Sequence, residues 1–437
     1  MEPHHIDHLT PIALITMAAL LCGLLFIRAR QPAIVGYIIA GVVLGPTGFE
    51  LVTNTQSVQI LAELGVIMLL FLIGMELSLR GFKAVYKIAV GTAILQIILF
   101  VSAFSVIGYN LDWELSQILL FGFALSLSST AVAIKILEET DDLRTEVGRI
   151  TVGVLIAQDL AVIPMLLIIN SFGENTVPGM EYLIVIKLLS SVGFLAWLAW
   201  FLSRREGIKL PLVTLLERRP DIAPLAALAS CFTLATLSGV LGLSTAYGAF
   251  IAGLVIGNSN ARNIMHQATH SIQTVLMMVF FLSIGLLIDL DYITTHWSQV
   301  LSLLALVTIF KTIFNVFILR LLKEPWERAV QTGVVIGQVG EFSFVLVAAG
   351  LTHNIISADS YRLMIAVIAL SLIISPMWLS TARRLHKLTE QGYTSLKDIL
   401  TGFISSENFE NSPNDPLAEL SAEIKKLNTP HSKKKKP

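Results

Sequence analysis

The stretch Val152-Gly-Val-Leu-Ile-Ala-Gln158-Asp159-Leu160-Ala-Val-Ile-Pro164 places an amide and a carboxyl group inside a long apolar segment. About 20 apolar residues cross the hydrocarbon core of a bilayer as a helix, so Asp159 is expected near membrane mid-depth. A carboxylate there costs at least about 2.5–3.5 kcal/mol on insertion scales, and such residues usually mark a path for ions or protons. The alternative is a structural Asp held by its neighbours. The surroundings of Asp159 therefore decide how the rest of the chain is interpreted.

The composition indicates that most of the chain lies in a membrane. The chain has 437 residues, of which 54% are hydrophobic and 14% charged, whereas soluble domains carry about 25% charged residues. A net charge of −1 gives no field that would attract nucleic acid. Cys22 and Cys231 lie in separate apolar segments without metal-ligand spacing, and we interpret them as small hydrophobic residues.

About thirteen apolar segments follow one another, and each is expected to be a helix because lipid offers an unpaired backbone no other partner. The segments cover approximately 9–27, 33–48, 58–78, 86–108, 115–137, 148–170, 182–202, 222–238, 242–257, 272–288, 297–319, 329–350 and 361–381. Lys and Arg gather in alternate loops, and acidic residues gather in the others. Basic loops are cytoplasmic. The pattern predicts an all-α, multi-pass protein of a bacterial inner membrane, with its N-terminus outside and its C-terminus cytoplasmic.

The chain repeats itself, because three sequence matches share nearly one offset. They are Gly36 to Gly45 with Gly248 to Gly257 (248 less 36 is 212), Ile73-Gly74 with Ile284-Gly285 (211), and the polar runs that start at Ser126 and Gly337 (211). Two six-span repeats, about 1–170 and about 222–381, are then joined by a seventh span at about 182–202. Seven spans precede the second repeat, so the repeats are inverted. Inverted repeats with interrupted helices are typical of secondary transporters.

Two spans are interrupted at corresponding places. The fifth contains Leu125-Ser126-Leu-Ser128-Ser129-Thr130, and the twelfth contains Gly337-Gln338-Val-Gly340-Glu341-Phe-Ser343. Mid-span Gly and polar residues predict helix breaks, which survive in a membrane where they line a wet cavity. The ends of the half-helices would then offer partial charges to ions. Alternatively, the hydroxyl groups bond back to the preceding turn of an intact helix.

Lys311 lies deep in the eleventh span, too far from either end for its side chain to reach an interface easily. A buried lysine needs an anion or must be deprotonated, and Asp159 and Glu341 are the available acids. We expect Lys311 to pair with Asp159. Gln96 is a further mid-span polar residue, for which the sequence offers no clear partner.

Together these motifs resemble the Kef-type branch of the monovalent cation:proton antiporters, the CPA2 family, and within it the MagA-like subgroup. The resemblance covers about 5–385, nearly all of the membrane part. It implies a homodimer of thirteen-span protomers that need no cofactor. A scaffold would comprise the first three and the middle spans, and a mobile core would comprise spans four to six and eleven to thirteen.

The resemblance also assigns roles. Asp159 would hold the cation and the proton in turn, with Gln158 beside it and Lys311 as its charge partner when no ion is bound. The remaining site residues would lie in the two breaks: Ser128, Ser129 and Thr130 in the fifth span, and Gln338 and Glu341 in the twelfth.

The chain departs from the glutathione-regulated members of that branch. Its antiporter domain, 1–385, is followed by a polar tail, 386–437, in which we find no nucleotide-binding motif. The tail ends in four lysines, Lys433 to Lys436, which would favour anionic lipid. A disordered tail is the alternative.

The residues therefore predict antiport of K⁺ or Na⁺ against protons by alternating access, and no enzymatic activity. One alternative is an iron carrier of MagA type, although Fe²⁺ favours His and carboxylate ligands and no His occurs in mid-span; His4, His5 and His8 lie at the N-terminus. An ion channel is a second alternative. An intramembrane aspartyl hydrolase is a third, but it needs two carboxylates that share a proton, and Gln158 fills the adjacent place.

Overall fold

A computed structural model describes residues 6–29, 32–51, 55–76, 85–173, 218–241 and 243–374, with isolated positions between 186 and 202 and between 378 and 387. These residues are almost entirely helical. The α-helices are α1 (Ile6–Arg28), α2 (Ala33–Leu44), α3 (Thr55–Glu76), α5 (Tyr86–Asn110), α6 (Leu115–Ser126), α7 (Thr130–Glu139), α8 (Glu146–Gly173), α11 (Ala223–Val240), α12 (Thr245–Gly257), α13 (Arg262–Leu286), α14 (Leu290–Thr295), α15 (Trp297–Leu321), α16 (Trp326–Val335), α17 (Phe342–Thr352) and α18 (Ala358–Ile373).

Several helices are long and apolar enough to cross a bilayer. Among the described residues five qualify by length and composition, namely α5, α8, α11, α13 and α15, and shorter apolar helices accompany them. The prediction of an all-helical, multi-pass membrane protein is confirmed. Most of the predicted seventh span, 182–202, and of the tail, 386–437, lies outside the described residues.

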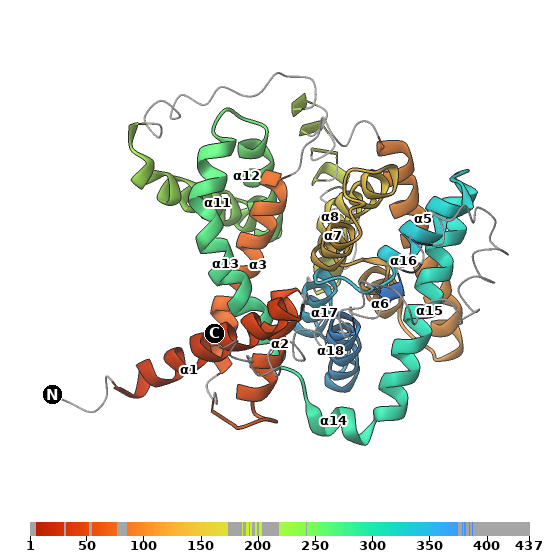
Figure 1. Ribbon diagram of the computed structural model, residues 1–437, viewed down its shortest axis with the longest axis horizontal. Coiled ribbons are helices and arrows are strands. Elements are labelled where there is room, and N and C mark those ends of the chain that lie inside the picture. Colours follow the sequence, from red (N-terminus) through yellow and green to blue (C-terminus); the bar gives the residue numbers. More distant parts are fainter. Residues whose placement is uncertain are drawn as a thin grey trace, which may run out of the picture.

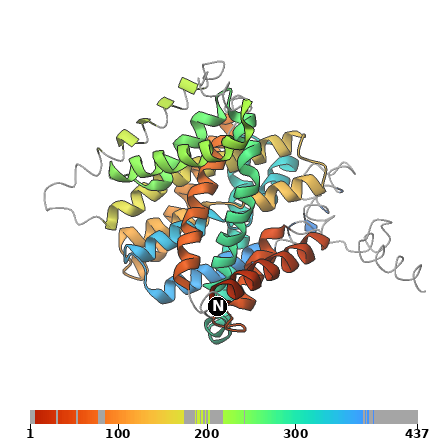
Figure 2. The ribbon, with the colours of Figure 1, turned by 90° about the vertical axis from the view of Figure 1, so that its left-hand side faces the viewer.

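The helices form two bundles, and each bundle takes helices from both ends of the chain (Figure 1). In one, α3 packs against α12 and α13, α2 packs against α1 and α13, and α11 packs against α12. In the other, α5 contacts α6, α8 and α15, while α17 contacts α6, α8 and α18. Figure 2 looks onto the first bundle. We call them the scaffold bundle (α1–α3, α11–α13) and the core bundle (α5–α8, α15–α18), and α14 lies in the connection between them (Figure 1).

The helices keep the spacing of the sequence repeat. Four pairs begin 211 or 212 residues apart, as comparison of their first residues shows: 297 less 86 for α5 and α15, 326 less 115 for α6 and α16, 342 less 130 for α7 and α17, and 358 less 146 for α8 and α18. The pair α2 and α12 also differs by 212 (245 less 33). Among the described residues, each half of the chain therefore contributes three helices to the scaffold bundle and four to the core bundle.

Glycines let the scaffold helices approach closely. A Cβ atom at Gly41 of α2 would meet the backbone of Gly285 in α13, and one at Gly74 of α3 would meet the backbone of Gly253 in α12. Small residues at such crossings allow tight packing between membrane helices. Gly41 and Gly253 are equivalent in the repeat, as are Gly74 and Gly285. The repeated glycines of the sequence therefore mark two equivalent crossings, in each of which one half of the chain packs on the other.

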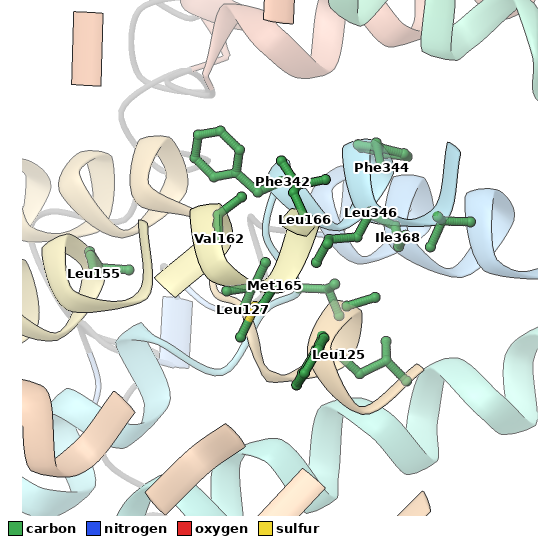
Figure 3. Close-up of a cluster of buried hydrophobic side chains, with 14 of the residues drawn as sticks. Leu125, Leu127, Leu155, Val162, Met165, Leu166, Phe342, Phe344, Leu346 and Ile368 are labelled. Atoms are coloured by element: carbon green, nitrogen blue, oxygen red, sulfur yellow. The ribbon is translucent and has the colours of Figure 1, made fainter. Parts of the chain in front are cut away.

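The hydrophobic centre of the core bundle surrounds the interrupted spans. Figure 3 shows hydrophobic side chains gathered there. The labelled residues are Leu125 and Leu127 from the fifth span, Leu155, Val162, Met165 and Leu166 from α8, Phe342, Phe344 and Leu346 from α17, and Ile368 from α18. All are at least nine-tenths buried. This packing holds both breaks against α8, the helix that carries Asp159.

Candidate functional site

Both predicted helix breaks are present, and they touch each other. The fifth span is helical up to Ser126 and again from Thr130, and the twelfth up to Val335 and again from Phe342. Ser128 and Val339 form an antiparallel β-bridge, and the Gly340 amide donates to the Leu127 carbonyl at 3.0 Å. The expectation of interrupted, crossing helices is therefore confirmed.

The crossing relates the two repeats. Ser128 and Val339 are 211 residues apart (339 less 128), the offset of the repeat, and they pair in opposite directions. Two inverted copies that meet on their common axis would pair in this way. Close approach needs Gly340, because a Cβ atom there would lie 2.6 Å from the carbonyl oxygen of Ser128. In the second copy Ser371 stands where the first has Asp159 (371 less 212), so the acid belongs to one half only.

Asp159 faces the start of a half-helix. Its side chain is 5% exposed, and the hydroxyl group of Thr130, the first residue of α7, lies 3.2 Å from Oδ2 and 3.5 Å from Oδ1. The Ser129 hydroxyl caps the same helix by accepting a bond from the Val132 amide at 3.3 Å. A helix N-terminus carries partial positive charge. Asp159 therefore lies where an anionic oxygen is stabilised.

Gln158, beside Asp159 in the chain, contacts the break itself. Its Oε1 accepts a bond from the Ser128 amide at 3.0 Å, and its Nε2 donates to the Ser126 carbonyl at 3.2 Å. The Ser128 hydroxyl donates to the Ile336 carbonyl at 2.8 Å and so ties the fifth span to the twelfth. The structure thus brings Gln158 and the predicted Ser128, Ser129 and Thr130 together around the crossing.

Lys311 contacts the other side of the fifth-span break, at the C-terminal end of α6. The side chain is fully buried in α15. Its Nζ donates to the carbonyl of Leu125 at 3.0 Å and to that of Leu127, where α6 ends and its carbonyls would otherwise lack partners. The ammonium group also lies 5.9 Å from the ring centroid of Phe100. Pairing of Lys311 with Asp159 stays a prediction.

Glu341 and Gln338 occupy the second break, as predicted. The Glu341 carboxyl group interacts with the Ser129 hydroxyl and with the amides of Thr130 and Ala131 at the start of α7. Its Oε2, however, is buried without a hydrogen-bond partner among the described residues, and so are both amide atoms of Gln338. Buried polar atoms without partners are costly. The second break therefore contains buried polar atoms that the described residues leave without partners.

Two members of the site were not predicted. Gln96 of α5 lies between Gln158 and Asn315 of α15, with its Oε1 2.8 Å from Gln158 Nε2 and its Nε2 2.7 Å from Asn315 Oδ1. A signal for Asn315 existed, because it follows Lys311 by four residues and so shares a helix face with it. The sequence showed Gln96 as a lone polar residue and gave no indication of its partners.

A cavity of about 380 Å³ lies between the two bundles. Its walls come from α3, α12 and α13 of the scaffold bundle and from α8, α17 and α18 of the core bundle. On α8 it is lined by Asn170 and Leu166. Leu166 is seven residues from Asp159, or about 10 Å along a helix that rises 1.5 Å per residue. The cavity thus touches the face of α8 that carries Asp159, and its lining on this helix ends at Leu166.

The described residues contain no group of three or more His, Cys, Asp and Glu side chains that could hold a metal ion. His4 and His5 lie outside the described residues. Beside Asp159 the structure places the hydroxyl group of Thr130.

Discontinuous helices that cross at mid-span, joined in inverted repeats, define a secondary transporter. A family model described as "Sodium/hydrogen exchanger, transmembrane" matches residues 16–383. The chain belongs to this cation:proton antiporter family. The predicted resemblance to the Kef-type branch is confirmed, since potassium-efflux proteins are among the relatives of this chain.

Three relatives illustrate the range of proteins to which the chain is similar. The chain is 47% identical over 407 residues to "Iron transporter MagA" of Paramagnetospirillum magneticum, covering 93% of each chain. It is 30% identical over 422 residues to "K(+) efflux antiporter 5" of Arabidopsis thaliana, covering 95% of this chain and 72% of that one. It is 30% identical to "Glutathione-regulated potassium-efflux system protein KefC" of Cronobacter sakazakii, of which it spans 59%.

A solved structure shares the fold. The sodium proton antiporter MjNhaP1 from Methanocaldococcus jannaschii, at pH 8, superimposes with a TM-score of 0.65. The match covers 87% of this chain and 99% of that one at 16% sequence identity. At this identity the likeness establishes the fold alone.

Proposed function

We propose that the chain exchanges a monovalent cation, K⁺ or Na⁺, for protons by alternating access, and that both compete for Asp159. The observation that carries the proposal is the crossing itself. It sets one buried carboxyl group against the hydroxyl group of Thr130 at the N-terminus of a half-helix. Transporters bind substrates and coupling ions at such interrupted helices near the midplane.

Competition at one carboxylate suffices for coupling. A proton and a dehydrated cation cannot occupy the same oxygen atoms, so release of one accompanies arrival of the other. Gln158 adds a carbonyl oxygen without charge, which favours exchange of one cation for one proton. Lys311 and Glu341 balance the partial charges of the half-helix ends and leave Asp159 as the acid that titrates during the cycle.

The cavity between the bundles supports an access route from one side. It opens where α8 and α13 end and α12 begins, which the distribution of Lys and Arg assigns to the outside of the cell. The protein would work in a bacterial inner membrane as a homodimer. The scaffold bundle would stay in place while the core bundle carries Asp159 past it.

Exchange in proteoliposomes tests the proposal. The wild-type chain should move K⁺ or Na⁺ against an imposed pH gradient, and Asp159→Asn should abolish this exchange, because an amide cannot release a proton. The control is Asp112→Asn, the same chemical change in an exposed loop, which should retain wild-type rates. Full exchange by a folded Asp159→Asn protein would remove this residue from the mechanism.

An iron carrier is the second candidate, because a relative that is 47% identical is named an iron transporter. Adding Fe²⁺ to the same assay, beside K⁺, Na⁺ and Li⁺, separates the two. Uptake of Fe²⁺ by a variant that lacks the N-terminal histidines, but not by Asp159→Asn, together with absence of monovalent exchange, would favour iron. Concentrative uptake driven by the pH gradient would exclude a channel.

A further inference from the structure

A series of hydrogen bonds between buried side-chain amides connects the two helix breaks through Gln96 of α5 and Asn315 of α15. It starts at the Ser128 amide, which donates to Gln158. Gln158 donates to Gln96 at 2.8 Å, and Gln96 donates to Asn315 at 2.7 Å. Asn315 donates to the Ile336 carbonyl at 3.0 Å. The three side chains are at most 1% exposed, so water does not compete for these bonds.

This series of hydrogen bonds can run in one direction only. At one end a backbone N–H group can only donate, and at the other end a backbone carbonyl group can only accept. Reversing any one of the three amides would set oxygen against oxygen on one side and N–H against N–H on the other. Each mismatch would leave buried polar atoms unpaired, at a cost of about 1–3 kcal/mol per group. The fixed ends therefore determine the orientation of every amide between them.

The orientation matters most at Gln158. Its oxygen faces the fifth-span break next to Asp159, while its NH₂ group faces away, towards Gln96 and the Ser126 carbonyl. An amide oxygen attracts a cation, whereas an NH₂ group in the same place would repel it. A carbonyl has two lone pairs, so Gln158 Oε1 retains acceptor capacity after it accepts the Ser128 amide.

We propose that Gln96 and Asn315 are positioning residues that fix the Gln158 carbonyl towards the cation site. They act through Gln158 and do not themselves touch the ion. The inference rests on the proposed function, because it concerns the affinity of that same site. It adds two residues from α5 and α15, the repeat-related pair of helices, to the determinants of cation binding.

Exchange kinetics in proteoliposomes test the inference. Gln96→Met keeps the volume of the side chain and removes both of its hydrogen bonds. The apparent KM for the transported cation should rise about three- to tenfold, as loss of about one buried hydrogen bond implies. The maximal rate should change much less, because Asp159 and the crossing are intact. The rise is limited because Ser126 still accepts a bond from Gln158.

Two comparisons distinguish positioning from general damage. In a Gln158→Met background, Gln96→Met should add little to KM, since residues that act through one another are not additive. Thr92→Val is the matched control: Thr92 is buried one turn earlier on α5 and its hydroxyl has no partner among the described residues. It should leave KM unchanged.

Asn315→Leu, which removes the far anchor, provides a second variant should Gln96→Met not fold, and it should shift KM in the same direction. An unchanged KM in either folded variant, an equal rise in Thr92→Val, or full additivity with Gln158→Met would overturn the inference and leave the proposed function standing. Absence of monovalent exchange by the wild-type chain would overturn both.

Discussion

Lys311 and Glu341 each contact one of the two helix ends at the fifth-span break. The ammonium group of Lys311 lies on the carbonyls where α6 ends, and the carboxyl group of Glu341 lies at the amides where α7 begins. Each side chain thus contacts backbone groups that the helix end leaves without intrahelical partners. Without them, two half-helix termini would face each other uncompensated in a region that lipid surrounds.

This arrangement predicts that Lys311→Met destabilises the protein even in the absence of transported ions. The variant would leave buried carbonyls at the end of α6 without their donor, and each such group costs about 1–3 kcal/mol. The melting temperature of the purified protein in detergent should fall by several degrees.

Thr308→Val is the control for that measurement. Thr308 lies on the same helix, is buried, and its hydroxyl has no partner among the described residues. Its replacement should leave the melting temperature nearly unchanged. A Lys311→Met protein as stable as the wild type would show that the lysine does not support the break.

The sequence supplied the charged members of the site and the polar residues of the two breaks, but it did not assign Gln96 and Asn315 to the site. Asp159 and Lys311 are conspicuous because charge in an apolar segment is costly. Gln96 and Asn315 cost less to bury and interrupt their segments less visibly, and their role depends on which helices are neighbours. That adjacency comes from tertiary packing, which a pattern along one chain does not encode.

At the scale of the helices, the glycine crossings of the scaffold bundle give a paired prediction. Gly253→Ala would drive a Cβ atom into the carbonyl oxygen of Phe71, and Gly41→Ala would do the same at Leu282. Overpacking of this kind costs about 1–3 kcal/mol. Because the two crossings are equivalent, both variants should lower the melting temperature in detergent by similar amounts.

Gly91→Ala is the matched control on α5. A Cβ atom there would lie 3.5 Å from the Leu322 methyl groups, at ordinary contact distance, and alanine favours helix by up to about 1 kcal/mol. This variant should be as stable as the wild type or more so. If Gly253→Ala behaved like Gly91→Ala, the close approach of α12 and α3 would be incorrect.

The helix breaks could be predicted because the polar residues at mid-span and the sequence repeat indicated the same positions. The twelfth span alone shows glycines and a Glu, which an intact helix could also contain. Its match to the fifth span turned this into a prediction, and both breaks were found. The exact ends could not be predicted, because Leu127 and Ile336 are apolar residues that belong to the breaks. The Leu127 carbonyl accepts a bond from the Gly340 amide, and the Ile336 carbonyl accepts bonds from the side chains of Ser128 and Asn315.

For the molecule as a whole, the cavity predicts which face is open in this conformation. In a background with Cys22→Ala and Cys231→Ala, Ala349→Cys should react with a membrane-impermeant maleimide added to intact cells, because Ala349 lines the cavity. Ala366→Cys should not react, since Ala366 of α18 is buried against α15. Labelling of Ala349→Cys from the cytoplasmic side alone would reverse the assigned orientation.

The overall architecture followed from three properties that are visible in the sequence: apolar segment length, repeat offset and span parity. The division into two bundles did not follow from these, and came from the family resemblance. Each bundle combines helices from both halves, and only the packing of repeated glycines and breaks across the halves reveals which helices belong together.

The antiparallel pairing of Ser128 with Val339 has a consequence for energetics. In the proposed alternating access, two halves that share a fold would exchange their shapes about this bridge, so that the two end states would contain similar contacts. Their free energies would then be close to each other, and neither state would be strongly favoured. Net flux would follow whichever of the cation and proton gradients is steeper, and the transporter would work equally well in reverse.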